Sequence, residues 1–219
     1  GFSAVVATLN ATGANDTSIA GGDGVDTLTL TDTGAVTITD GYFTNVSTME
    51  KLVLSSTGDQ SLTLGTNFSS AFATATITTA TAANEKSIEI AGGLYNGDTT
   101  IVATSDGLGD ATGESHSIVT GGGDDTITLT ASSFVSHATG STITINSGAG
   151  DDSITLTTGT LADGAGNQAI TIDAGAGKDT VDMTKVNGAT ADKFGMAKIV
   201  IESGDSLSTS YDVIKGFDD

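Results

Sequence analysis

Three short segments of this chain recur at a constant interval, and this interval constrains the fold more than any other feature. The segments end at Asp125, Asp152 and Asp179, so successive copies are 27 residues apart. Each has the form Gly-x-Gly-x-Asp, followed by Thr or Ser and an apolar residue. A fixed period of about 20–50 residues is typical of solenoids, in which each coil packs only on its neighbours.

Between these segments, aliphatic residues alternate with threonine, as in residues 126–130 and 153–157. This period of two is typical of strands with one buried face. One unit would hold a turn (148–152), a strand (153–157), a loop of about eleven residues and a second strand (169–173). The pattern predicts an all-β fold, namely a parallel β-solenoid or β-roll with about 27 residues per coil and Gly-rich turns on one edge.

Equivalent residues of successive coils are expected to stack about 4.8 Å apart. About eight such coils fit into 219 residues. The hydrophobic fraction is 37%, with few aromatic residues, which favours a thin aliphatic core. Three ladders are predicted inside it: Ile127, Ile154 and Val181; Leu129, Leu156 and Met183; and, on the opposite wall, Ile118, Ile145 and Ile172.

The N-terminal part of the chain is less regular. We interpret residues 1–90 as an irregular solenoid region with one Gly-rich turn at 21–28, and residues 91–219 as the regular β-roll. Both are expected to form one continuous domain of a longer protein. Residues 50–64 predict two strands joined by a Gly-Asp turn, and residues 66–85 a short helix. The weak repeat between about 32 and 90 is interpreted as drift rather than as a partner surface.

The charge balance excludes several classes of function. The chain has 27 acidic and 7 basic residues, a formal net charge of −20 and no cysteine. Phosphate backbones would repel it, so we expect no nucleic-acid partner. Disulfides and thiolate metal sites are excluded as well. No apolar run reaches the ~18 residues that cross a bilayer, so we expect no membrane insertion.

The turns carry the chemistry of a hard cation site. Glycine permits positive φ and a close approach of backbone to an ion. Carbonyls and carboxylates of two stacked turns would offer only oxygens, of which calcium takes six to eight. Stacked carboxylates would also repel one another without a counterion. The predicted metal ligands are Gly22, Gly24, Asp26, Asp98, Gly121, Gly123, Asp125, Gly148, Gly150, Asp152, Gly175, Gly177 and Asp179.

Other interpretations stay open for part of this set. The four turns could end strands without a metal, as Asx-type turns do. At Asp98 the plain turn is the stronger interpretation, and for Asp205 and Asp212 the sequence favours neither. Asp163, in the loop of the opposite edge, is expected to bind no calcium.

The two histidines, His116 and His137, are interpreted as solvated loop residues without a catalytic or metal-binding role. They are 21 residues apart, and no Glu stands at ligand spacing around them. The chain also has no Gly-x-Ser-x-Gly nucleophile elbow. We therefore expect no enzymatic activity.

The segments 21–28, 121–127, 148–154 and 175–181 resemble the nonapeptide turns of the RTX calcium-binding β-roll family. This resemblance implies calcium between coils and type I secretion from a Gram-negative cell. RTX arrays place turns on both edges, whereas the 27-residue spacing places them on one. In this respect, and in its Thr and Ala content, the chain is more similar to Gram-negative surface-layer (S-layer) proteins.

We therefore expect a non-catalytic structural module of a secreted, extracellular bacterial cell-surface protein, folded and assembled through calcium. Its expected partners are calcium, further copies of itself in a lattice or filament, and surface polysaccharide. Two alternatives remain. The chain could be a stalk or ligand-binding segment of an RTX adhesin, with a contact patch at Tyr42-Phe43 or Phe68-Phe72, or the accessory roll of a secreted enzyme.

Overall fold

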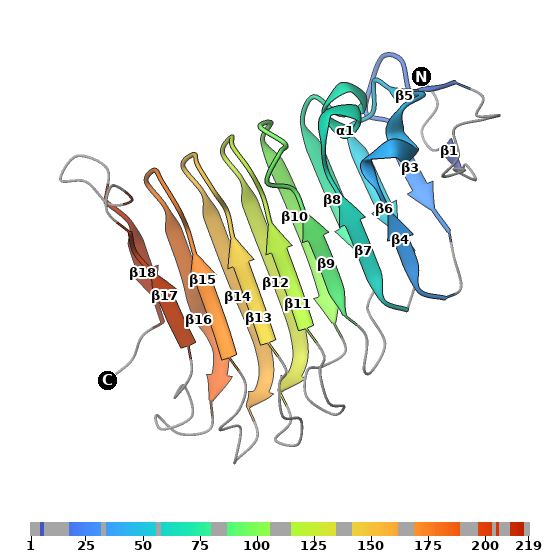
Figure 1. The fold of residues 1–219 in the computed structure, drawn as a ribbon. Helices are drawn as coiled ribbons and strands as arrows, with labels where there is room; N and C mark the ends of the chain where they lie inside the picture. The colour runs from blue at the N-terminus through green and yellow to red at the C-terminus, as the bar shows by residue number, and fades with distance from the viewer. Residues whose placement is uncertain are drawn as a thin grey trace.

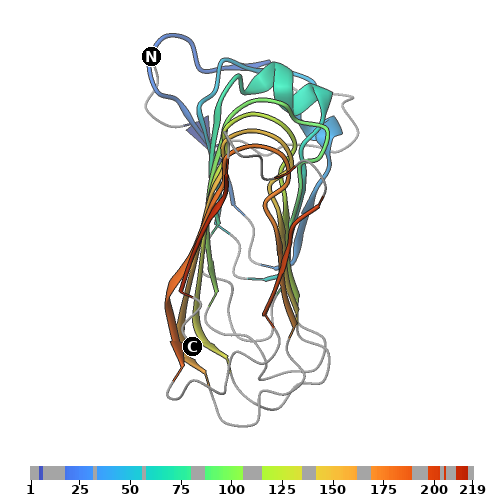
Figure 2. The ribbon, with the colours of Figure 1, turned by 90° about the vertical axis from the view of Figure 1, so that its left-hand side faces the viewer.

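The chain folds as a parallel β-solenoid, as its repeat predicts. A computed structural model describes residues 5–6, 18–31, 34–55, 58–79, 87–105, 115–134, 142–161, 169–188, 197–202, 205 and 211–216. In this part of the chain two walls of strands face each other, and the coils stack along one axis from the N-terminal to the C-terminal end (Figure 1). Seen along that axis, arches join the walls at one edge (Figure 2).

Each wall is a parallel sheet whose neighbouring strands come from successive coils. The first sheet has the order β1 (Val5–Val6), β3 (Thr27–Leu30), β6 (Lys51–Leu54), β8 (Ala75–Thr79), β10 (Thr99–Ser105), β12 (Thr126–Phe134), β14 (Ser153–Leu161), β16 (Thr180–Gly188) and β18 (Val213–Lys215). The second sheet has the order β17 (Ala197–Val200), β15 (Ala169–Asp173), β13 (Thr142–Asn146), β11 (Ser115–Val119), β9 (Ile88–Ala91), β7 (Gln60–Thr63) and β4 (Val36–Ile38). A small pair, β2 (Ile19–Ala20) and β5 (Val46–Ser47), lies beside them.

The register of the strands confirms the first and the third predicted ladder in full, and the second only from Leu129 to Leu156, without its last step to Met183. Ile127 pairs with Ile154, and Ile154 with Val181. On the opposite wall Ile118, Ile145 and Ile172 pair in the same way. The pairing of Leu129 with Leu156 is regular, but the register shifts between β14 and β16 directly after Thr155. Strand β14 is nine residues long, so the predicted strand 153–157 was too short at its C-terminal end.

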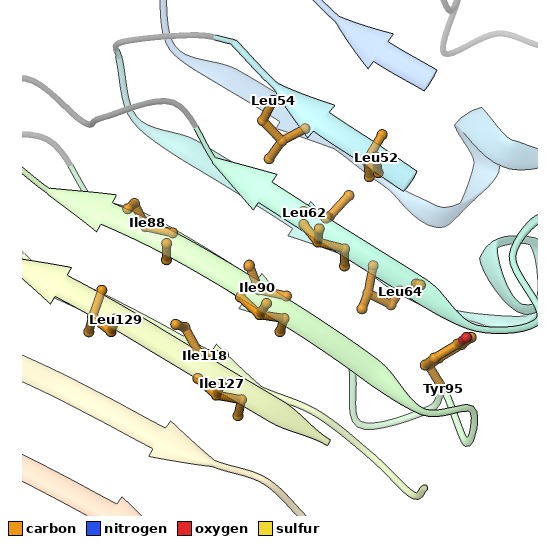
Figure 3. Packing of buried hydrophobic residues seen from close by; sticks show 14 of the residues in the cluster. Leu52, Leu54, Leu62, Leu64, Ile88, Ile90, Tyr95, Ile118, Ile127 and Leu129 are labelled. Atoms are coloured by element: carbon orange, nitrogen blue, oxygen red, sulfur yellow. The ribbon is translucent and has the colours of Figure 1, made fainter. Parts of the chain in front are cut away.

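The space between the walls is filled by aliphatic side chains (Figure 3). Ile90, Ile118, Ile127 and Ile154 are all fully buried, because alternate residues of each strand point inward. Each inward position meets its equivalents in the coils before and after it, which extends the core over the length of the solenoid. Both sheets continue through residue 90, so the described strands before and after it belong to the same two walls.

The irregular N-terminal coils carry two short helices on the edge that elsewhere carries the Gly-rich turns. These are the 3-10 helix η1 (Asp40–Phe43) and the helix α1 (Thr66–Ala71), which lies within the predicted segment 66–85. The Asp40 carboxylate accepts hydrogen bonds from the Gly65, Asn67 and Phe68 N–H groups at 2.9, 3.1 and 2.8 Å. One coil thus caps the helix of the next.

An aromatic cluster fills the edge beneath these helices. Phe68 and Phe72 stack at 4.4 Å between ring centroids, and Phe43 meets Phe68 edge-on at 5.0 Å. Tyr95 joins the cluster at 5.3 Å from Phe68. These four rings are at most 1% exposed. The predicted adhesin contact patch was therefore wrong for Phe43, Phe68 and Phe72, because their apolar area stabilises the core instead of facing a ligand.

His116 is also buried, so its assignment to a solvated loop was wrong. It lies inside β11, on the same face as Ile118, and pairs with Ile88 and Ile143. Its Nδ1 accepts a hydrogen bond from the Ile88 N–H at 3.1 Å. Burial lowers the pKa of His116 to about 4 and keeps the ring neutral near pH 7. His137 lies outside the described residues.

Candidate metal centre at the turn edge

Three Gly-rich turns stack directly on one another where the second sheet passes into the first. Gly122, Ala149 and Ala176 form consecutive parallel bridges. The Ala149 N–H donates to the Gly121 carbonyl, and the Ala176 N–H to the Gly148 carbonyl, both at 2.9 Å. Two carbonyls expected to face a cation thus already accept a hydrogen bond from the next coil, although each keeps a second lone pair.

Glycine is required in these turns for two reasons. Gly123, Gly148, Gly150, Gly175 and Gly177 have positive φ, which side chains other than glycine rarely tolerate. A Cβ atom at Gly148 or Gly175 would also lie only 2.0 or 1.8 Å from a carbonyl oxygen of the preceding turn. Gly22 and Gly24 have positive φ but an open surrounding, whereas a Cβ at Gly121 would lie 2.1 Å from the Tyr95 carbonyl oxygen.

The residues that stand at or directly before the start of the strands from β3 to β18 in the first sheet form a column along this edge, which we call the inner column. The register of the strands places one residue of every coil in it. Its members, from the N-terminal end, are Asp26, Glu50, Ala75, Thr99, Asp125, Asp152, Asp179 and Asp212.

Carboxylates of the inner column link each coil to the one before it. The Asp125 N–H donates to Asp152 Oδ1 at 2.7 Å, and the Asp152 N–H to Asp179 Oδ1 at 2.8 Å. The series continues at both ends, with the Thr99 N–H bound to Asp125 Oδ1 and the Asp179 N–H bound to Asp212 Oδ1. Hydrogen bonds to an ionised acceptor are stronger than neutral ones, so this ladder helps to hold the coils in register.

Four aspartates of the inner column bury their second carboxylate oxygen without a hydrogen-bond partner. This holds for Oδ2 of Asp26, Asp125, Asp152 and Asp179, whose side chains are at most 2% exposed. Burial and the neighbouring carboxylates Asp125 and Asp179 raise the pKa of Asp152 to about 7. Burial likewise raises the pKa of Asp125, and that of Asp179 to about 6. The edge therefore contains a row of buried oxygens that need a positive partner.

A second column of carboxylates, exposed to solvent, runs beside the first. Its hydrogen bonds point in the opposite direction along the solenoid. Here each carboxylate accepts an N–H from the following coil: Asp98 from Asp124, Asp124 from Asp151, and Asp151 from Lys178, at 2.9–3.0 Å. We call this the outer column. Asp98 belongs to it, because Thr99 and not Asp98 is in register with Asp125. The count of 27 residues misplaced Asp98 by one position, since the coil is 26 residues long here.

The structure adds two acidic residues to the inner column that the predicted ligand set lacks. Asp212 follows Asp179 after 33 residues, and Glu50 follows Asp26 after 24. Neither spacing is 27, so the repeat does not reveal them. The available signal was local: each stands immediately before an apolar-alternating segment, as Asp125 and Asp152 do. Asp163, expected to bind no calcium, lies outside the described residues.

These residues fit a hard cation only in part. The donors are all oxygens, and the unpartnered Oδ2 atoms are the kind of ligand that calcium takes. However, no group of three or more acidic or histidine side chains in the described ranges comes together as a metal site. Asp26, Asp125, Asp152 and Asp179 each offer one spare carboxylate oxygen, and backbone carbonyls or water would have to complete the coordination shell.

Comparisons with known proteins do not assign the chain to a family. No protein-family model, curated protein or solved structure matches it. In the part of the chain that the structure describes, no helix is long and apolar enough to span a bilayer.

Proposed function

We propose that this chain is a non-catalytic structural module of a secreted bacterial cell-surface protein, and that calcium ions bound along the inner column stabilise its coils. One observation carries the proposal. Asp125, Asp152 and Asp179 each bury a carboxylate with one oxygen bonded to the preceding coil and the other unpartnered. A row of such oxygens is costly unless a cation or protons neutralise it.

Calcium fits this row better than other common metals. It accepts a flexible shell of carboxylates, carbonyls and water, whereas magnesium demands near-ideal octahedral geometry. Zinc prefers sulfur and imidazole ligands. Protons are the competing species, because the pKa of Asp152 is raised to about 7. A test at pH ~8 therefore separates the two, since the carboxyl groups of Asp152 and Asp179 are then mostly ionised and a cation remains as their neutralising partner.

The membership of a surface layer is supported by the resemblance of the turns to RTX repeats and by the threonine-rich, one-edged spacing. A solenoid with two flat walls also suits assembly into a lattice or filament, because both walls repeat with every coil (Figure 2). The adhesin alternative is less well supported, because Phe43, Phe68 and Phe72 of its expected contact patch lie in the core.

Thermal unfolding at pH ~8 tests whether the folded protein binds calcium. We expect calcium to raise the melting temperature well above that in chelator, because a ligand of the folded state adds about 2.7 kcal/mol at a hundredfold excess over its Kd. Magnesium should act more weakly. Asp152→Asn should lose most of the calcium effect, while Asp124→Asn in the exposed outer column should keep it. Equal melting temperatures with calcium and with chelator would refute calcium binding.

Assembly needs a separate measurement. Sedimentation and electron microscopy of the protein with and without calcium should show ordered sheets or filaments only when calcium is present. A strictly monomeric protein in calcium that nevertheless shows the melting shift would separate the metal from the surface-layer role.

A further inference from the structure

The outer face of the first sheet carries a regular array of threonines that the binding of calcium does not use. Strands β8, β10, β12 and β14 lie side by side in this wall (Figure 1). Their outward residues are in register and form three rows that cross the strands. We call this set the threonine array; it consists of Thr76, Thr78, Thr100, Val102, Thr104, Thr126, Thr128, Thr130, Ser153, Thr155 and Thr157.

The absence of charge distinguishes the threonine array from the outer face of the second sheet. In a chain with a net charge of −20, none of its residues is charged. A row on the second sheet, by contrast, carries Glu89 and Lys198 between serines and threonines. Lys51 on β6 and Asp182 on β16 border the array on its two sides. The four strands between them present a neutral surface, which is complementary to a neutral partner and not to an ionic one.

The array is also regular in both directions of the sheet. Neighbouring strands are about 4.8 Å apart and alternate residues of one strand about 6.6 Å apart, so hydroxyl and methyl groups repeat on a rectangular grid. Successive strands of the wall lie almost behind one another in the view along the axis, so the grid has little twist (Figure 2). Threonine is branched at Cβ and stiff at χ1, and a partner would therefore order few rotamers on binding.

The size and chemistry of the array distinguish between possible partners. It covers roughly 300 Å², well below the ~800 Å² that each partner of a stable dimer buries, which disfavours a second copy of the chain. It has no aromatic side chain on which a sugar ring would stack. Ice is a neutral crystal of hydrogen-bond donors and acceptors, and its surfaces repeat at distances close to the two spacings of the grid.

We propose that the threonine array binds ice. Each hydroxyl donates one hydrogen bond and accepts two, so it can hold a water molecule at a lattice position. The γ-methyl groups between the hydroxyls offer no competing partner, and the water beside them keeps its bonds to other water. The wall is already rigid, so the single weak contacts act together. This function is separate from the binding of calcium at the turn edge.

Slow, directional freezing of a dilute solution of the protein in calcium buffer tests the proposal, by comparing the protein content of the ice with that of the remaining liquid. Ice excludes ordinary solutes, so we expect the unmodified protein to be enriched several-fold over an excluded one. Thr128→Lys puts a long, charged side chain into the middle of the array and should abolish the enrichment. Thr155→Lys on the neighbouring strand should do the same and gives a second, independent variant.

Thr144→Lys is the matched control. Thr144 is exposed on the outer face of β13, in the second sheet, and the substitution changes the net charge by the same amount. This variant should enter the ice like the unmodified protein. Circular dichroism verifies that each variant is folded before it is frozen.

The other outcomes each contradict the proposal in a different way. Exclusion of the unmodified protein from ice would overturn it and leave the binding of calcium standing, because melting curves measure that separately. Equal enrichment of the unmodified protein, Thr128→Lys and Thr155→Lys would show that the threonines serve the sheet alone, as β-branched residues commonly do. If ice excluded the protein but Thr128→Lys removed its binding to crystalline cellulose, or its self-association in sedimentation, the array would bind a polysaccharide or a second copy instead.

Discussion

At the scale of single residues, the two oxygens of an inner-column aspartate have different tasks. At Asp152, Oδ1 accepts the N–H of the neighbouring coil, which a neutral asparagine could also do. Oδ2 stays buried and unpartnered, which only a bound cation or proton makes favourable. The exposed carboxylates of the outer column also accept an N–H from a neighbouring coil but remain in water. Burial, and not the hydrogen bond, therefore distinguishes a candidate metal ligand from a structural aspartate.

The burial of His116 should make the free energy of unfolding of the solenoid decrease in acid. Its pKa falls from 6.5 to about 4 on folding, so the unfolded chain binds more protons between these values. The contribution to the free energy of unfolding is complete above pH ~6.5 and is lost as the pH falls toward 4. Protonation would bury a charge and remove the acceptor of the Ile88 N–H. We expect a loss on the order of 3 kcal/mol over this range.

Denaturant unfolding at several pH values, with His116→Asn as the reference, measures this loss. Asparagine retains an acceptor near the position of Nδ1 but does not titrate. The carboxylates titrate in both proteins, so their contribution cancels in the difference. A difference in stability between the two proteins that does not vary between pH 6.5 and 4 would contradict the buried, neutral histidine.

At the scale of elements, the turns depend on glycine more where they stack than where they stand free. A Cβ at Gly175 would lie 1.8 Å from the Gly148 carbonyl oxygen, and the residue has a φ of +74°. At Gly93 the nearest atom would be 3.8 Å away. We expect Gly175→Ala to lower the free energy of unfolding by more than ~3 kcal/mol, and Gly93→Ala by less than ~1 kcal/mol. Urea unfolding of both variants compares them; similar losses would mean that the turns do not stack as closely as described.

A second prediction at this scale follows from which residues of a strand point into the core and which point outward. Ile154 is fully buried and pairs with Ile127 and Val181, whereas Thr155 points to the outer face of the first sheet. Ile154→Ala should therefore cost about 2–5 kcal/mol through the cavity it leaves. Thr155→Ala should cost well under ~1 kcal/mol. Chemical denaturation measures both, and a larger loss at Thr155 would reverse the assigned facing.

The sequence predicts those elements whose signal is periodic. Alternation and the 27-residue spacing were sufficient for the strands, the ladders at Ile127 and Ile118, and the edge that carries the turns. The same spacing failed at Asp98 and Glu50, because coils of 26 and 24 residues move the register by a few positions. His116 was missed although it stands 27 residues before the inward-facing Ile143, because polarity was given more weight than position in the repeat.

At the scale of the whole molecule, repulsion among the negative charges opposes the compact fold. A net charge of −20 on 219 residues favours expansion, and a third of the 27 acidic residues lie in two columns along one edge. Exposed charges are screened by any salt, whereas the buried inner column is shielded from the ions of bulk solution. The molecule should therefore respond to ionic strength in general and, separately, to a cation that enters the inner column.

Melting curves at pH ~8 separate these two responses, with chelator present in the potassium chloride series and absent from the calcium series. Raising potassium chloride from about 20 to 500 mM should increase the melting temperature gradually, because it screens repulsion over the whole surface. A few millimolar calcium, at matched ionic strength, should add a larger increase that saturates with concentration, because it reflects binding to sites. Asp152→Asn should reduce the calcium response and leave the response to potassium chloride almost unchanged, since one charge in twenty alters the overall repulsion little. If potassium chloride of equal ionic strength reproduced the whole effect of calcium, the ion would act by screening alone, and the inner column would need a proton instead of a metal.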